Sequence, residues 1–282
     1  MRRVALLAVS ITLACGGSTS VERRADGEVA EGRWNEAFAS YRTAVERQPE
    51  GRVLGKLGVA ALRVGKLNEA AAAFARMGSE DPSRREEAAD GLELVARSAE
   101  RAGDTTALRI AIDGLRDVAP NRPVGRFVLA LETRGALSAS DRLELTAAAV
   151  GAAPDGDTAD SLLLQYATVL RDANDCERAS RIYQAVAMRS TLKARATTAR
   201  HAEQDCALLV GRTRLEAGAP ADALAWLEEA IKADSASRSG VTALEAMATA
   251  LTALGDTVGG TLVQAVAERY KAALPDSGSA AR

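Results

Sequence analysis

Small and apolar residues recur at fixed distances behind a series of glycines. Counted from each glycine, a small or aliphatic residue follows at +5, an aromatic or aliphatic residue at +9 and a proline at +17. The three sets are Gly32, Ala37, Tyr41 and Pro49; Gly65, Ala70, Phe74 and Pro82; and Gly103, Leu108, Ile112 and Pro120. Positions +5 and +9 are four residues apart and therefore lie on one face of a helix. Each set predicts a turn at the glycine and a helix that ends before the proline.

The same register continues, less regularly, towards the C-terminus. A fourth set has Gly135 and Pro154 with a longer turn, and it predicts helices over 124–134 and 141–151. The later sets are Asn174, Ala179 and Tyr183; Gly218, Ala223, Leu227 and Ala230; and Gly255 with a helix that ends before Pro275. The pattern therefore predicts about six to seven pairs of helices.

This spacing resembles the tetratricopeptide (TPR) repeat. In that repeat a first helix ends in glycine, a second helix carries alanine and then an aromatic residue, and a proline closes the unit. The second set also has the Leu57-Gly58 pair of a TPR first helix. The resemblance covers residues 20–274 and implies an all-α, TPR-like helical-hairpin solenoid wound into a right-handed superhelix. In such proteins the first helices line a concave face that binds peptides or protein segments.

The start of the chain resembles a bacterial lipoprotein signal peptide. Arg2 and Arg3 precede an uncharged, mostly apolar run over 4–14, which is too short to span a bilayer. Cys15 follows Ala14, although Thr12 stands where such signals usually have leucine. The resemblance implies that residues 1–14 are removed and that Cys15 carries lipid. The alternative is an ordinary signal, which would leave a soluble periplasmic or secreted protein.

A lipid anchor would hold the folded part close to a membrane. Residues 15–20 are expected to form a flexible tether, because Gly16, Gly17 and Ser18 favour no regular structure. Gly16 rather than aspartate after the cysteine resembles the signal for transfer to the outer membrane, so we expect a lipid-anchored protein facing the periplasm. Residues 275–282 are polar and are predicted to be a disordered tail.

Composition narrows the class of partner. Aromatic residues make up 3% of the chain, and the net charge of −2 becomes −4 when Arg2 and Arg3 are removed. Nucleic-acid binding needs a basic stripe, so a mildly acidic chain is not expected to bind nucleic acid.

The two cysteines of the mature part are candidates for a disulfide. If 191–217 is one long helix antiparallel to the helix over 176–189, Cys176 and Cys206 lie nearly level across the pair, as a bridge requires. Two buried free thiols are the alternative.

The search for catalytic and metal-binding motifs gives no site. His201 is the one histidine, and the chain has no HExxH, CxxC, GxSxG or GxxxxGK[ST] sequence. We therefore predict no catalytic residue, no metal and no cofactor. Trp34 occupies a packing position of the repeat and is expected in the core, whereas Trp226 could face either the core or a partner.

The candidate site is the groove formed by the first helices. By register this face includes six arginines and three aliphatic residues: Arg52, Arg63, Arg97, Arg101, Arg171, Arg212, Val59, Leu164 and Leu208. Arginine grips carboxylates in a bidentate way, so these residues would suit an acidic or carboxylate-bearing segment. The alternative is that each arginine merely solvates a helix surface.

These observations favour a non-enzymatic scaffold that docks envelope proteins while anchored through Cys15. An envelope enzyme or glycan-binding accessory protein with an unrecognised site is a second hypothesis, although few aromatic residues are available for sugars. A self-associating structural repeat protein is a third.

Overall fold

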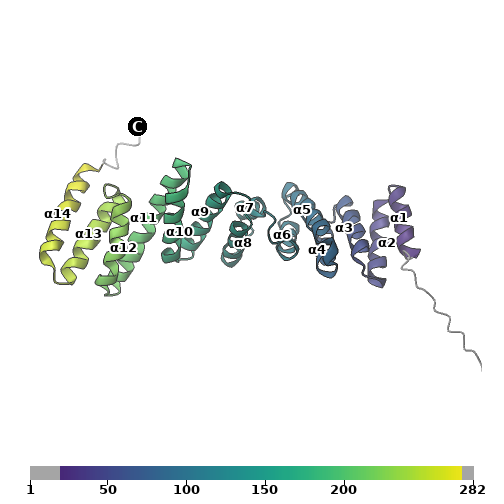
Figure 1. Ribbon diagram of the computed structural model, residues 1–282, viewed down its shortest axis with the longest axis horizontal. Coiled ribbons are helices and arrows are strands. Elements are labelled where there is room, and N and C mark those ends of the chain that lie inside the picture. The colour runs from purple at the N-terminus through teal and green to yellow at the C-terminus, as the bar shows by residue number, and fades with distance from the viewer. Residues whose placement is uncertain (1–19, 275–282) are drawn as a thin grey trace, which may run out of the picture. The chain divides into compact units, whose positions relative to one another are not determined.

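The structure, a computed structural model, describes residues 20–274 and is helical throughout this range apart from short turns (Figure 1). The predicted signal peptide, Cys15 and the polar tail lie outside the described residues. No helix within 20–274 is both long enough and apolar enough to cross a membrane. Two compact units divide after Pro120.

The first unit consists of three helical hairpins. Its helices are α1 (Ser20–Ala30) and α2 (Trp34–Arg47), α3 (Gly51–Arg63) and α4 (Leu67–Glu80), and α5 (Arg85–Ala102) and α6 (Thr105–Val118), with a short 3-10 helix, Pro82–Arg84, before α5. Successive helices pack against each other, and α3 also contacts α5 while α4 contacts α6. The hairpins are therefore stacked in two layers, one of first helices (α1, α3 and α5) and one of second helices (α2, α4 and α6).

The second unit consists of four hairpins. They are α7 (Gly125–Thr133) with α8 (Ala139–Gly151), α9 (Gly156–Asp172) with α10 (Cys176–Arg189), α11 (Lys193–Glu216) with α12 (Pro220–Ala233), and α13 (Arg238–Ala253) with α14 (Thr257–Ala273). The first helices α9, α11 and α13 contact one another in sequence. The long helix expected over 191–217 is confirmed as α11, and the longer turn of the fourth hairpin separates α7 from α8.

Every hairpin turn in the described range has one residue in the left-handed backbone region. Six are glycines with φ between 63° and 91°, and the seventh is Asn174 with φ of 62°. The left-handed conformation has a low energetic cost for glycine and, to a lesser degree, for asparagine. The positions of the glycines in the sequence therefore determine where the chain reverses direction. The predicted all-α fold of stacked helical hairpins is confirmed, with seven hairpins between residues 20 and 274.

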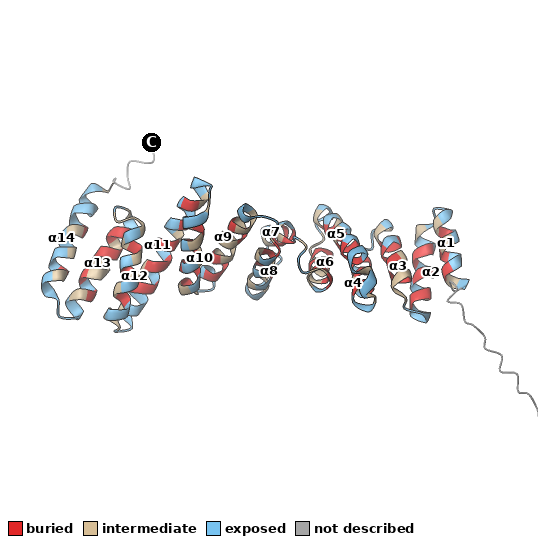
Figure 2. Cartoon of the chain, in the orientation of Figure 1, coloured by how far each residue is buried: buried red, intermediate tan, exposed pale blue. Residues whose placement is uncertain are grey.

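The core lies between the layers and is built from small residues and a few large ones (Figure 2). In the first unit the buried ring of Phe74 on α4 fills the space between two glycines, Gly58 on α3 and Gly91 on α5. A Cβ atom added at Gly58 would lie 2.7 Å from the ring, and one added at Gly91 would be closer still. Phe74, the aromatic residue at +9 of the second set, thus requires glycine on both neighbouring first helices.

The two cysteines belong to one core cluster of the second unit. This cluster contains Ala167, Leu170, Cys176, Ala179, Tyr183, Cys206 and Val210, and Trp226 packs against it from the next hairpin. Both cysteines are buried free thiols in this structure. Their pairing therefore stays a prediction, whereas their predicted position on adjacent antiparallel helices is confirmed.

Candidate functional site

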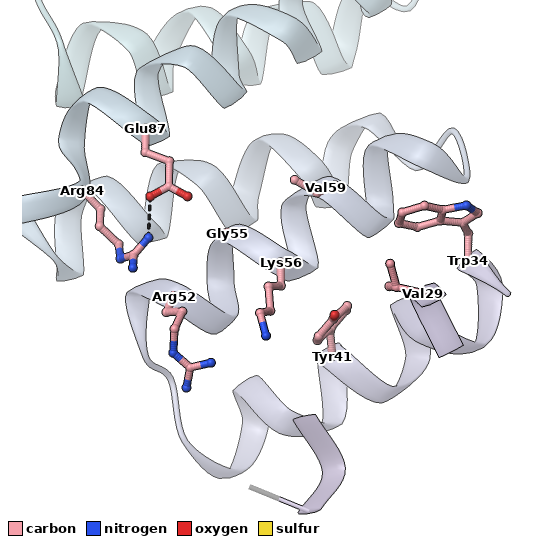
Figure 3. Close-up of a pocket in the computed structure, with 9 residues that line it drawn as sticks. All are labelled: Val29, Trp34, Tyr41, Arg52, Gly55, Lys56, Val59, Arg84 and Glu87. Atoms are coloured by element: carbon pink, nitrogen blue, oxygen red, sulfur yellow. Dashed lines mark hydrogen bonds and ion pairs between the residues drawn. The ribbon is translucent and has the colours of Figure 1, made fainter. Parts of the chain in front are cut away.

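A pocket opens on the first unit where α1, α2, α3 and the start of α5 meet (Figure 3). It has a volume of about 300 Å³ and is lined by Val29, Trp34, Tyr41, Arg52, Gly55, Lys56, Val59, Arg84 and Glu87. We call it the first-unit pocket. Arg52, Lys56 and Val59 project from one stripe of α3, because residues three and four apart share a helix face. Arg63 continues this stripe.

The first-unit pocket has a charged end and an apolar end (Figure 3). Arg52, Lys56 and Arg84 lie at the charged end, where Arg84 is paired with Glu87. Val29, Trp34 and Val59 lie at the other end. Such a surface can hold an apolar side chain and a polar or charged group side by side, which is the usual composition of a binding site.

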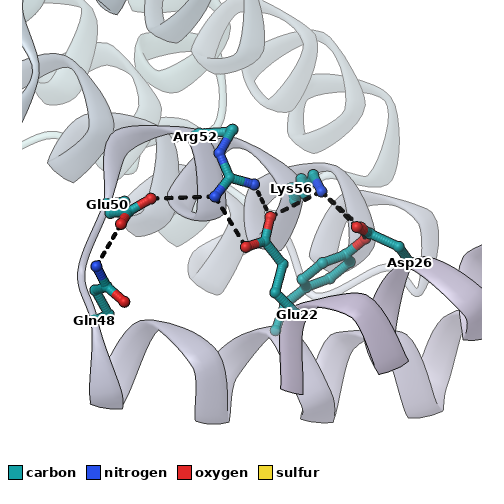
Figure 4. Close-up of polar contacts among 7 residues, drawn as sticks. Glu22, Asp26, Gln48, Glu50, Arg52 and Lys56 are labelled. Atoms are coloured by element: carbon teal, nitrogen blue, oxygen red, sulfur yellow. Dashed lines mark hydrogen bonds and ion pairs between the residues drawn. The ribbon is translucent and has the colours of Figure 1, made fainter. Parts of the chain in front are cut away.

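Two of the three cations of the charged end, Arg52 and Lys56, are neutralised by α1 (Figure 4). Glu22 is 1% exposed and accepts hydrogen bonds from Arg52 and, at 2.9 Å, from Lys56. Lys56 also donates to both carboxylate oxygens of Asp26, at 2.7 and 2.8 Å. We call these four residues the α1–α3 ion network. Because each of its charges has an opposite partner, Arg52 and Lys56 are already occupied.

Tyr41 extends the network from α2. Its hydroxyl donates to Asp26 at 2.6 Å. Burial opposes the ionisation of Asp26, but the hydrogen bonds from Lys56 and Tyr41 outweigh burial and hold the pKa of that carboxyl below its usual value. Burial and the hydrogen bond to Asp26 both raise the pKa of Tyr41. The hydroxyl therefore stays protonated and keeps α1, α2 and α3 connected.

Arg63 and Trp34 form the rim of the apolar end. The guanidinium carbon of Arg63 lies 5.4 Å from the centre of the Trp34 ring, within the range of a cation–π contact. The expectation that Trp34 packs in the core is therefore wrong. Its side chain is partly buried and lines the first-unit pocket instead, because it occupies the first position of α2, beside the turn.

On α5, Leu94 and two predicted arginines continue the same layer. The side chain of Leu94 is 50% exposed, and that of Val59 on α3 is 46% exposed. Arg97 is paired with Glu93, whereas Arg101 hydrogen-bonds the carbonyl of Arg97 at 3.2 Å. Among the described residues Arg63 and Arg101 form no ion pair. Both stand two positions before the turn glycine of their hairpins, so they are equivalent in register.

The sequence did not predict Leu94, Lys56 or Tyr41 as residues of the binding site. The register could have identified Leu94, because it lies nine residues before Gly103, as Lys56 lies nine before Gly65. Spacing could not have predicted the role of Tyr41, because its hydroxyl donates a hydrogen bond to a carboxylate fifteen residues away on another helix.

The remaining predicted groove residues lie in the second unit. Arg171 is paired with Asp172 at 3.2 Å and lines a smaller pocket of about 270 Å³ together with Leu164. Arg212 is 3.7 Å from Glu216. Leu208 is partly buried and packs against a core cluster, and the neighbouring Leu209 is 50% exposed. Arg171 and Arg212 thus each have a carboxylate partner within the second unit.

The described residues contain no cluster of three or more His, Cys, Asp or Glu side chains placed to hold a metal ion. His201 is exposed on α11. The charged groups of the first-unit pocket are held in ion pairs and hydrogen bonds with one another or with α1.

No family model matches the chain, and no curated protein sequence matches it. Among solved structures it is similar to the TPR domain of P58(IPK), with 14% identity, a TM-score of 0.35 and coverage of 90% of this chain and 84% of that one. A TPR repeat-containing protein from Cytophaga hutchinsonii gives 12% identity, a TM-score of 0.37 and coverage of 89% and 96%. A tetratricopeptide repeat protein from Parabacteroides merdae gives 16% identity, a TM-score of 0.29 and coverage of 89% of this chain and 91% of that one. We base the fold on the helix pairing above, since these TM-scores are too low to establish a shared fold.

Proposed function

We propose that the protein is a non-enzymatic scaffold that binds a segment of a partner protein along the first helices of its first unit. The observation that supports this most is the combination, on α3 and α5, of exposed aliphatic side chains with unpaired arginines. Val59 and Leu94 are each about half exposed, and Arg63 and Arg101 follow them on the same helix faces, one and two turns further along. Exposed apolar groups rimmed by charge are typical of protein interaction sites.

The partner segment is expected to carry apolar side chains and a carboxylate. Its apolar groups would cover Val59 and Leu94, and its carboxylate would face Arg63 or Arg101, because arginine offers paired donors to a carboxylate. Arg52 is not expected to contribute, since Glu22 already occupies it. Of the predicted arginines, we therefore propose Arg63 and Arg101 as the ones that face the partner's carboxylate.

The alternative, an enzyme or a glycan-binding protein, has less support. Sugar binding favours an open aromatic face, whereas Trp34 in the first-unit pocket has a guanidinium over its ring. The pocket's carboxylates are also engaged: Glu87 is paired with Arg84.

We propose further that the protein is anchored at the cell envelope through lipid on Cys15. This part rests on the resemblance of residues 1–15 to a lipoprotein signal. Since α1 begins at Ser20, five Cα-to-Cα steps of about 3.4 Å separate it from Cys15, so the first unit would lie within about 17 Å of the lipid. Labelled fatty acid should be incorporated into the wild-type protein and not into Cys15→Ser; no incorporation into the wild type would refute the anchor.

Site-specific photocrosslinking tests the scaffold function. A photoreactive residue placed at Leu94 should form an adduct with one protein in living cells, and the double change Arg63→Glu and Arg101→Glu should lower the yield of that adduct several-fold. Met188 on α10 is the control position, because it is 77% exposed and lies in the layer of second helices. Equal adducts at both positions, or a yield that charge reversal leaves unchanged, would count against the proposal.

A further inference from the structure

Two thiols meet inside the second unit. Cys176 is the first residue of α10 and Cys206 lies within α11. They share one core cluster, in which Cys176 is 4% exposed and Cys206 is fully buried. The two thiols are therefore packed in the same core, on neighbouring helices.

The helix geometry explains this shared position. α10 and α11 are antiparallel neighbours joined by a short turn, and Thr191 in that turn is fifteen residues from each cysteine. Because a helix rises about 1.5 Å per residue, equal distances from the turn bring the two positions to the same height. The shared position is therefore a property of the fold of this hairpin pair.

The two thiols differ in access to the surface. Cys176 lines a surface pocket of about 530 Å³, together with Asn174, Glu177, Thr213 and Arg214. Cys206 lies behind it and does not reach the surface. Burial, and then the neighbouring Cys176, raise the pKa of the Cys206 thiol, so Cys206 is the less reactive of the two towards an outside disulfide.

We infer that Cys176 and Cys206 form a disulfide that ties α10 to α11, with Cys176 as the residue that reacts first. The oxidant is a small-molecule or protein disulfide. The Cys176 thiolate attacks one of its sulfur atoms, forms a mixed disulfide and releases one thiolate. Cys206 then transfers its proton to that thiolate or to water and attacks the Cys176 sulfur, releasing the second thiol. Two cysteine thiols are oxidised, and the outside disulfide is reduced to two thiols.

This bond would close a loop of 29 residues and hold the fifth hairpin on the sixth. Restricting such a loop in the unfolded chain is expected to raise the melting temperature of the second unit by about 10 °C. In cells the bond depends on the proposed envelope location, because disulfides persist in oxidising compartments. The shared core position of the two cysteines does not depend on it.

The test uses the full chain with Cys15→Ser, purified reduced and equilibrated with glutathione disulfide while folded. After unfolding without reductant, alkylation should add two groups before oxidation and none afterwards, and a peptide pair linked through Cys176 and Cys206 should appear. Two alkylated cysteines after oxidation, or a lasting glutathione adduct in the wild type, would overturn the inference.

Two variants test the order of reaction. Cys206→Ala should accumulate a glutathione adduct at Cys176, whereas Cys176→Ala should leave Cys206 unmodified while folded; circular dichroism confirms folding of both. The reverse pattern would overturn the assignment of Cys176. If the bond forms in the purified chain but is absent from protein trapped with acid in cells, the envelope location fails and the disulfide geometry stands.

Discussion

Gly91→Ala is expected to destabilise the first unit, because the added methyl group would overlap the buried ring of Phe74. Three ring carbons of Phe74 lie within 2.6 Å of the position that the Cβ atom would take. Phe74 has little room to shift along α3, since Gly58 packs against the tip of the ring. The close approach of α4 to its neighbours therefore depends on glycine at both positions.

Gly27→Ala is a matched control with the opposite expected effect. Gly27 lies inside α1, is exposed, and has no atom within 4 Å of the place of an added Cβ. Alanine in a helix is favoured over glycine by about 1 kcal/mol, so this change should stabilise. Gly91→Ala gains the same propensity but adds overpacking of about 1–3 kcal/mol. The difference between the two variants isolates the packing cost, and we expect it to be about 1–3 kcal/mol.

Urea unfolding followed by circular dichroism measures both free energies. Adding Phe74→Leu to Gly91→Ala should recover part of the loss, because a smaller side chain makes room for the methyl group and the two sites are coupled. If Gly91→Ala stabilised the protein as much as Gly27→Ala does, the packing of Phe74 would not set the distance between α4 and its neighbours α3 and α5.

Further predictions concern charge and the binding surface. Asp26→Asn should lower stability near neutral pH, and the difference from the wild type should disappear in acid, below the folded-state pKa of Asp26. A depressed pKa contributes stability above the usual value of 3.8, and this contribution is lost as the pH falls through the folded-state pKa. A constant difference in urea titrations at both pH values would contradict this. Leu94→Asp should change the free energy of unfolding by less than about 0.5 kcal/mol, because the side chain is half exposed. The same substitution should abolish the crosslink that a photoreactive residue at Val59 forms with the partner. Glu203→Gln should stabilise the protein near neutral pH and have little effect below the usual carboxyl pKa, because burial and then Glu229 raise the pKa of Glu203 and so disfavour its charged form. A loss of stability on that substitution would show that the charge is compensated.

The glycine register predicted the fold because it reports on backbone conformation. A residue with positive φ is needed wherever two antiparallel helices join closely, and Gly65, Gly103 and Asn174 all serve this need. The long helix α11 and the level positions of Cys176 and Cys206 follow from the same counting. Helix rise and turn position are local properties, and local properties can be read from a sequence.

The contacts of the candidate site, in contrast, join residues that lie far apart in the sequence. Glu22 reaches Arg52 and Lys56 across thirty or more residues, and no periodicity pairs these charges. The sequence therefore assigned Arg52 to a partner, although α1 already binds it. Trp34 shows the same limit, since a residue next to a turn can face either side of the helix.

Hydroxyl-radical footprinting tests the central claim most directly. The labelling of Leu94 and Met188 is compared between the purified protein and the protein in its native membranes. If the first helices of the first unit bind a partner there, Leu94 should be protected in the membranes while Met188, at 77% exposure, stays labelled as in solution. Equal labelling of Leu94 in both preparations would contradict the account.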